Sequence, residues 1–294
     1  MNVKVLVTGS AGFLGRHTAR YFADQGWEVT GFDQVDHDEG KTIVGDLTAL
    51  DSISSAVAGN DVVIHIGAIG DVYLAGEQPA LAASVNVVGT ANVVEAALAH
   101  GARVVYASTW EVYGHPKFEP INEDHPTSPD HPYNITKLGG ESMLLAACRL
   151  RNLSGLALRL GTAFGTGLRP NSVFRIFIDR ARRAEPITVQ GDGSQGRQFT
   201  HAHDIAGAFE MAARSELTAM ALNIVGPETV TIRDLAEHIV SRFPTELRFG
   251  PPRPGDVPPA RVSADRARQL LGWQAQTSFH KGLDELIDDV LRED

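Results

Sequence analysis

The sequence predicts an α/β protein with a doubly wound parallel sheet and a smaller C-terminal lobe. Short apolar runs alternate with helical patterns through the first two-thirds of the chain, which is typical of parallel strands covered on both faces. A glycine-rich turn follows the first of these runs. After residue 165 the pattern changes to loop-forming stretches between helices, which indicates a second lobe whose loops face the end of the sheet.

The elements follow in order along the chain. The expected strands, apolar runs of roughly four to eight residues, are 3–9, 28–33, 41–46, 61–68, 102–108 and 154–161. The expected helices are 13–26, 79–100 and 133–152, followed in the second lobe by 173–184, 203–214, 231–243 and 279–292. We therefore expect a first domain over residues 1–165, with a return segment near 200–226, and a smaller substrate-binding lobe over 166–294.

Composition argues against several classes of function. The chain has 294 residues and a formal net charge of −10, which disfavours a nucleic-acid-binding surface. Its single cysteine, Cys148, cannot form an internal disulfide, lacks a cysteine companion for a metal site and fits a reducing compartment. No apolar run approaches the roughly 20 residues that cross a bilayer. We expect a cytoplasmic protein with no metal, membrane or nucleic-acid partner.

The turn "TGSAGFLG" places Gly9, Gly12 and Gly15 between the first strand and the first helix. Gly9 suits the tight turn, Gly12 a close backbone approach and Gly15 close packing of helix on sheet, so that the helix N-terminus can face a pyrophosphate. A merely tight turn between strand and helix is the alternative. The position directly after the first strand favours the dinucleotide interpretation.

The second strand ends at Asp33, where a carboxylate can accept hydrogen bonds from both hydroxyls of a ribose. The same carboxylate would repel a 2′-phosphate, and neither His37 nor Lys41 is an arginine directly after the acid. These observations predict NAD rather than NADP. Asp46, in "GDL" after the third strand, could meet the adenine amino group.

"PYNITK" places Tyr133 and Lys137 four residues apart, on one face of a helix. A neighbouring ammonium stabilises a phenolate and would lower the pKa of Tyr133, so that the phenol could take a proton from a sugar hydroxyl. Thr109, upstream, could hydrogen-bond the same oxygen. An ordinary surface pair is the alternative, but the three residues together suit hydride transfer between a carbinol carbon and a nicotinamide.

Eleven motifs in this order resemble the extended short-chain dehydrogenase/reductase superfamily, and within it the NAD-dependent nucleotide-sugar epimerases and dehydratases, which have a Rossmann sheet. The resemblance covers nearly the whole chain. The motifs are "TGSAGFLG", "GDL", "HIGA" (65–68), "NVVGT" (86–90), "STWEVYG" (108–114), "PYNITK", "LRLGTAFG" (158–165), "GDGSQGRQF" (191–199), "HAHDIA" (201–206), "RPGDV" (253–257) and "LLGW" (270–273).

The resemblance implies a role for each matching residue. The catalytic residues are Thr109, Tyr133 and Lys137, with Glu111 beside them. NAD is held by Gly9, Gly12, Phe13, Leu14, Gly15, Asp33, Asp46, Leu47, Ile66, Gly67, Ala68, Asn86, Ser108, Tyr133 and Lys137. The nucleotide sugar is held by Ser108, Thr109, Trp110, Glu111, Thr162, Arg169, Val173, Arg197, Arg253 and Asp256. Surface positions for Arg197 and Arg253, and a turn-side role for Asn86, are the alternatives.

Two stretches bear on the substrate. Thr162, with Arg169 and a proline seven and eight residues later, is similar to the pattern of UDP-glucuronate 4-epimerases, in which these side chains would hold the C6 carboxylate. Gly161, Ala163 and Thr166 depart from that pattern, and Arg169 could instead be a solvent-facing charge.

"STWEVYG" bears on the reaction. Trp110 stands where the 4,6-dehydratases resemble "STDEVYG", and an indole cannot protonate a leaving hydroxyl. Glu111 is shared with UDP-glucuronate decarboxylases, which resemble "STSEVYG", or it could pair structurally. We predict a UDP-sugar 4-epimerase, and among these a UDP-glucuronate 4-epimerase. The alternatives are a UDP-glucuronate decarboxylase or another nucleotide-sugar dehydratase, and a non-catalytic NAD-binding protein. A homodimer through helices 79–100 and 133–152 is implied by the resemblance, with burial inside one chain as the alternative.

Overall fold

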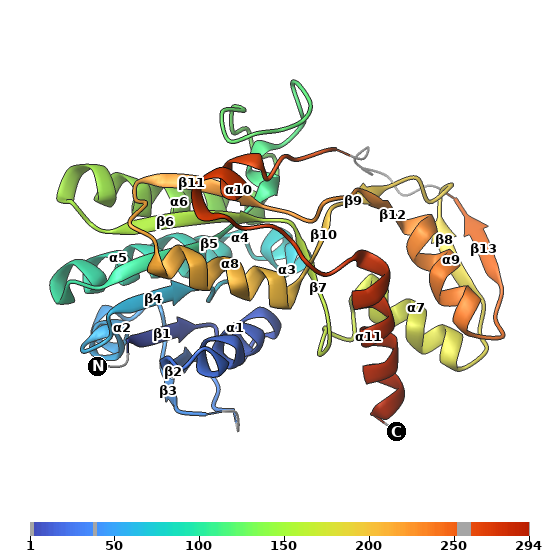
Figure 1. The fold of residues 1–294 in the computed structure, drawn as a ribbon, viewed down its shortest axis with the longest axis horizontal. Helices are drawn as coiled ribbons and strands as arrows, with labels where there is room; N and C mark the ends of the chain where they lie inside the picture. The colour runs from blue at the N-terminus through green and yellow to red at the C-terminus, as the bar shows by residue number, and fades with distance from the viewer. Residues whose placement is uncertain (1–2, 38–39, 252–259, 294) are drawn as a thin grey trace.

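A computed structural model describes residues 3–37, 40–251 and 260–293. Its central sheet has seven strands in the order β3-β2-β1-β4-β5-β6-β11 (Figure 1), and every neighbouring pair is parallel. The strands are β1 (Lys4–Thr8), β2 (Glu28–Asp33), β3 (Thr42–Val44), β4 (Val62–His65), β5 (Arg103–Thr109), β6 (Gly155–Leu160) and β11 (Met220–Ile224). The doubly wound fold is thereby confirmed. The strand order reverses between β1 and β4, where such sheets form a crevice.

Helices cover both faces of the sheet, as the unbroken apolar strands require. Alternate residues of β1 enter different cores: Val5 and Val7 pack with α1 (Phe13–Asp24) and α8 (Ala202–Arg214), whereas Leu6 packs on the other side. That other face is covered by α2 (Leu50–Val57), α5 (Gly89–His100) and α6 (Pro132–Arg151). The predicted return segment supplies α8 and the edge strand β11.

The predicted helix 79–100 forms as α4 (Pro79–Ala83), a π-helical turn η1 (Ser84–Val88) and α5. Contrary to the expectation from sequence, this stretch has the length and mean hydropathy, 1.4, of a membrane span; it is one such helix among the described residues. Half of it is buried inside the molecule, and it packs against α2 and α6. Buried helices of core domains share this composition, so the stretch is weak evidence for a span.

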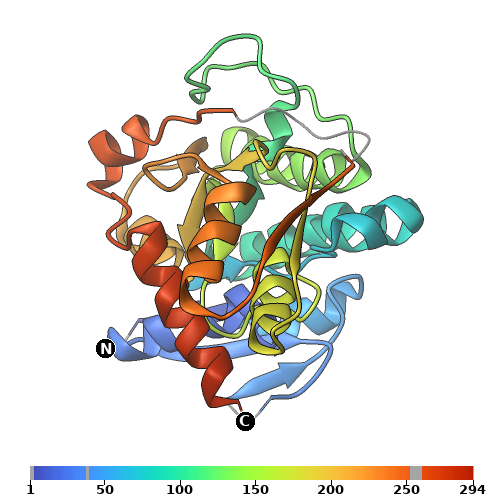
Figure 2. The same ribbon diagram turned by 90° about the vertical axis from the view of Figure 1, so that its right-hand side faces the viewer.

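The second lobe is built around a cluster of aromatic rings. Phe164, Phe174, Phe199 and Phe279 contact one another, with ring centroids 4.9 to 6.2 Å apart. Figure 2 shows its helices in front of the sheet: α7 (Val173–Arg182), α9 (Ile232–Arg242) and α11 (Phe279–Arg292). Its short strands are β7 (Thr162–Phe164), β8 (Ile187–Gln190), β9 (Gly196–Arg197), β10 (Phe199–His201), β12 (Val230–Thr231) and β13 (Leu247–Gly250).

Several short elements were not predicted. They are α3 (Val72–Glu77), α10 (Asp265–Leu271), the 3-10 turn η2 (Trp110–Tyr113), the helix α2 and the paired short strands of the second lobe. Strands of two to four residues, such as β9 and its partner β12, form because tertiary packing aligns them. Each is too short to show an alternation of apolar and polar residues in the sequence.

Candidate active site

A cavity of about 710 Å³ opens at the carboxyl ends of the central strands. Many of the residues predicted for NAD, the sugar or the chemistry line it: Gly9, Gly12, Phe13, Leu14, Gly15, Asp33, Leu47, Ile66, Gly67, Ala68, Ser108, Thr109, Trp110, Glu111, Tyr133, Lys137, Thr162 and Arg169. The sheet brings them together because β1, β2, β4, β5 and β6 all end at this edge.

The glycine turn is packed too closely for side chains. A Cβ added to Gly9 would lie 2.8 Å from the backbone of Gly67, and Gly9 has a φ of +73°. A Cβ on Gly15 would lie 1.9 Å from the carbonyl oxygen of Gly9. Among the described residues, no side chain caps the N-terminus of α1 at Gly12. The first N–H groups of this helix are therefore available to a ligand. These features fit a dinucleotide pyrophosphate.

Asp33 is held at the cavity by its own neighbours. Its Oδ2 accepts a hydrogen bond of 3.0 Å from the backbone N–H of Ala11, and its Oδ1 one of 2.7 Å from that of Gln34. The carboxylate is therefore fixed beside the glycine turn. Asp46 does not line the cavity. Its Oδ1 accepts from the N–H of Thr48 in the turn before α2, and its contact with the adenine stays a prediction.

The loop after β4 is positioned by a buried histidine. Thr8 Oγ1 accepts from the N–H groups of Ile66 and Gly67, both at 3.1 Å, so its hydroxyl hydrogen is directed to Nδ1 of His65, 2.7 Å away. The other ring nitrogen, Nε2, then donates to Thr90 Oγ1 at 3.0 Å. Burial, together with a smaller effect of the charge of Lys137, lowers the pKa of His65 to about 3, so the ring is neutral.

Asn86 supports the cavity from behind and does not line it. Its Oδ1 accepts from the N–H of Ile69 at 2.7 Å, and its Nδ2 donates to Thr136 Oγ1 at 2.9 Å. Ile69 does line the cavity. Asn86 thus links the loop after β4 to the helix that carries Tyr133, and its assignment to the NAD site stays a prediction.

Helix α6 begins with Pro132 at its first turn and with His131 accepting from the N–H of Tyr133, so that Tyr133 and Lys137 share one face. The expected lowering of the Tyr133 pKa by Lys137 is not found. Burial raises the pKa of Tyr133, the charge of Glu111 raises it further, and Arg169 opposes both. Lys137 is itself buried, and burial lowers its pKa to about 7 against the opposing charge of Glu141, so its ammonium is only partly populated at neutral pH.

The end of β5 supplies the other polar groups. Thr109 Oγ1 accepts from the N–H of Glu111 at 3.3 Å, which leaves its O–H to donate into the cavity. Ser108 donates to Glu141 at 2.6 Å. Burial raises the pKa of Glu111, and the nearby charge of Arg197 opposes this. Trp110 stands next to Glu111 on the cavity wall.

The second lobe closes the other side. Arg169, which lines the cavity, donates from Nη1 to Asp71 Oδ2 at 3.3 Å. Arg197 acts on Glu111 through its charge, but neither it nor Val173 lines the cavity; Val173 begins α7 and packs in the aromatic core. Arg253 and Asp256 lie outside the described residues.

Several lining residues were not predicted from the sequence; among them are Ala11, Gln34, Val35, Ile69, Gly70, Val72, Leu160, Gly161, Ala163 and Leu168. Six of the ten lie one or two positions after the end of a predicted strand, and Leu160 and Gly161 lie at the end of one; that position is the signal that could have found them. Glu141 was not predicted either, and its spacing of four residues from Lys137 indicates the same helix face.

A family model described as the NAD dependent epimerase/dehydratase family matches residues 5–224. The chain belongs to this family. Its members depend on NAD, which agrees with the glycine turn and Asp33.

Relatives within this epimerase/dehydratase family match over almost the full chain. The UDP-glucose 4-epimerase of Mycolicibacterium smegmatis is 30% identical, with 97% of this chain and 98% of that protein covered. UDP-glucuronic acid decarboxylase 1 of Danio rerio is 29% identical over 99% of this chain and 73% of its own. Among solved structures, MoeE5 in complex with UDP-glucuronic acid and NAD is 32% identical, has a TM-score of 0.90 and covers 99% of both chains.

Proposed function

We propose that this protein is a UDP-sugar 4-epimerase whose substrate is UDP-glucuronate. The observation that carries the proposal is Arg169, which lines the cavity and acts on Tyr133 through its charge. Thr162 lines the same cavity. A guanidinium with a hydroxyl suits a sugar carboxylate, because its paired donors match the two oxygens. The likeness to MoeE5, solved with UDP-glucuronic acid and NAD, supports this choice.

The chemistry we propose uses three side chains. Tyr133 takes the proton from O4 of the sugar, and the hydroxyl of Thr109 orients O4. Lys137 in its ammonium form, together with the charge of Arg169, offsets the rise in the pKa of Tyr133 that burial and Glu111 cause. The glycine turn and Asp33 would hold NAD, which would supply the hydride chemistry at C4 of the sugar, with oxidation from one face and reduction from the other. Tyr133 then gives the proton back to O4, so the product differs from the substrate only in configuration.

Decarboxylation is the second candidate, and Glu111 favours it. A ketone at C4 makes the C6 carboxylate that of a β-keto acid, which loses CO2 readily. Glu111 lines the cavity with a raised pKa, and a decarboxylase is among the relatives. Epimerisation requires that Arg169 and Thr162 hold the carboxylate away from the alignment for loss of CO2. Trp110 disfavours dehydration, because an indole N–H can donate a hydrogen bond but is too weak an acid to protonate a leaving hydroxyl.

Incubation with UDP-glucuronate tests the proposal. Mass spectrometry should find a product of unchanged mass, and this product should elute with a UDP-galacturonate standard in chromatography. Loss of CO2 would make the protein a decarboxylase. Preferred turnover of UDP-glucose would overturn the assignment of Arg169, and absence of turnover on a panel of nucleotide sugars would support a non-catalytic NAD-binding protein.

We also propose a homodimer in the cytoplasm. The helices expected at the interface carry exposed apolar side chains, which are Leu81, Val88, Ile135, Met143 and Leu150. Burying them against a second copy would remove apolar surface from water. One chain has a mass of 31.6 kDa. Light scattering during size-exclusion chromatography should give twice that mass, and the mass of a single chain would reject this part of the proposal.

A further inference from the structure

A buried ion pair lies directly behind the cavity, and none of the proposed steps uses it. Glu141, on α6, is 2% exposed and Arg159, on β6, is 7% exposed. Arg159 donates from Nη2 to Glu141 Oε1 at 2.6 Å and from Nε to Oε2 at 3.1 Å. Two apolar side chains would fill such a space without the cost of removing two charges from water. Stability alone therefore does not explain a buried ion pair at this position.

Glu141 touches the active site on two sides. Its Oε2 accepts the hydroxyl of Ser108 at 2.6 Å, and Ser108 is the residue before Thr109 on β5. Glu141 also lies one helical turn after Lys137, on the same face of α6. One carboxylate thus contacts the strand end that carries Thr109 and faces the lysine that is proposed to stabilise the phenolate.

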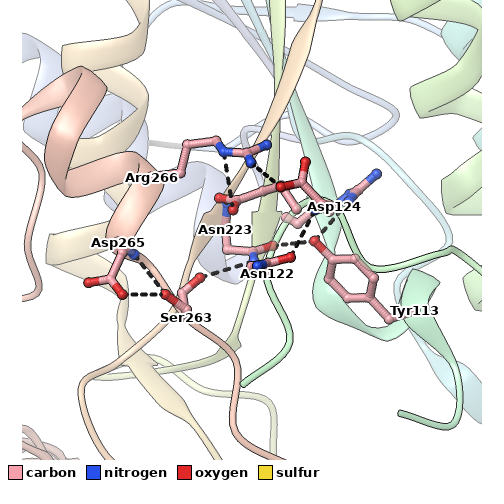
Figure 3. Close-up of polar contacts among 9 residues, drawn as sticks. Tyr113, Asn122, Asp124, Asn223, Ser263, Asp265 and Arg266 are labelled. Carbon is pink, nitrogen blue, oxygen red and sulfur yellow. Dashed lines mark hydrogen bonds and ion pairs between the residues drawn. The ribbon is translucent and has the colours of Figure 1, made fainter. Parts of the chain in front are cut away.

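The pair is anchored on its far side by a polar network. Arg159 donates from Nη1 to the hydroxyl of Tyr113 at 2.8 Å, and that hydroxyl donates to Asn223 Oδ1 at 2.8 Å. Figure 3 shows this outer part, in which Asn223 lies between Tyr113 and Ser263. Asn223 Nδ2 donates to the carbonyl of Ser263 at 3.0 Å. Arg159 is thereby fixed, and with it the carboxylate.

We propose that Glu141 is a positioning residue for the reaction: it fixes the Ser108–Thr109 strand end and keeps Lys137 in its ammonium form. The inference rests on the proposed roles of Tyr133 and Lys137. The groups that face Lys137 are Glu141 and Tyr133 from its own helix, His65 from β4 and Tyr106 from β5, whose ring centroid lies 4.3 Å from Nζ. His65 is neutral above a pKa of about 3, and Glu141 is the charge that opposes the effect of burial on the pKa of Lys137.

The pH dependence of kcat tests the inference. Deprotonation of Lys137 should give the alkaline limb of the profile, since it removes the charge that stabilises the phenolate. Glu141→Gln should move this limb to lower pH by about one unit, the lower end of the effect of a neighbouring charge. Ser108→Ala, the matched control, loses the contact with Glu141 but keeps the carboxylate; it should lower kcat at every pH and leave the limb in place.

A second readout does not depend on turnover. The rate at which acetic anhydride modifies Lys137, followed by peptide mass spectrometry, reports its neutral fraction at each pH. The midpoint should lie near 7 in the wild type and lower in Glu141→Gln. If that variant does not fold, because Arg159 is left unpaired, Glu141→Gln with Arg159→Met removes both charges and should show the same change.

Lys137→Met and the Glu141 variants test the proposed catalytic roles and the role of Glu141 separately. If Lys137→Met turns over at the wild-type rate, the proposed roles of the catalytic residues fail. If Lys137→Met is inactive but the folded Glu141 variants keep the wild-type alkaline limb and modification midpoint, Glu141 has no positioning role and the inference is overturned.

Discussion

The buried histidine His65 should make the protein's stability depend on pH. Its ring is neutral in the folded chain, where burial lowers its pKa to about 3, against an ordinary value of 6.5. Between these two values only the unfolded chain binds the proton, so unfolding is favoured as pH falls. Stability from the neutral ring is complete above pH 6.5 and is lost progressively down to about pH 3. The difference between the pKa values of His65 in the folded and unfolded chain corresponds to about 5 kcal/mol of folding stability.

Urea unfolding of the wild type and of His65→Gln, followed by tryptophan fluorescence at several pH values, measures this effect. The variant loses the titrating ring, and other titrating groups are common to both proteins. The difference in free energy of unfolding between the two should therefore shrink by about 1.4 kcal/mol for each pH unit below 6.5. Curves that stay parallel from pH 7 to pH 4 would refute the account of a neutral, buried His65.

Three further predictions concern the cavity. Gly15→Ala should abolish NAD binding in calorimetry, because the added Cβ would lie 1.9 Å from the carbonyl oxygen of Gly9. The control Gly76→Ala should bind NAD normally, because its Cβ would lie 3.4 Å from the nearest atom. Equal affinities of the two variants would contradict the close packing of the turn. Arg169→Met should raise KM for UDP-glucuronate about 10- to 100-fold, the loss of a charge-assisted hydrogen bond, with little change for UDP-glucose; equal effects on both substrates would remove Arg169 from the carboxylate. Tyr133→Phe should lower kcat by at least ~10²-fold with the fold unchanged by circular dichroism, and near wild-type turnover would reject Tyr133 as the base.

The parts of the fold that sequence predicted well are those with a strong local signal. β1, β4 and β5 are continuous apolar runs because both of their faces are buried, and α6 has a proline at its start and an Asn152 in the left-handed conformation at its end. Pairs such as β9 with β12 depend on distant segments, and no local pattern marks them. The π-helical turn at Ser84–Val88 is likewise invisible in an otherwise regular apolar helix.

The candidate site divides in the same way. The glycine turn, Asp33 and the Tyr133–Lys137 spacing are local patterns, so sequence located them in the cavity. Where a side chain points is a tertiary property, so sequence could not show that Asp46 and Asn86 accept hydrogen bonds from backbone N–H groups. The charge state of Lys137 depends on burial and on Glu141, and a motif of two residues contains neither.

UDP-glucuronate that carries deuterium at C4 offers the most direct test of the proposed epimerisation. The account predicts a product of unchanged mass, with inverted configuration at C4 and the deuterium retained there, because the same hydride leaves and returns. A product that has lost CO2, or one whose C4 deuterium has been replaced by hydrogen, would contradict it.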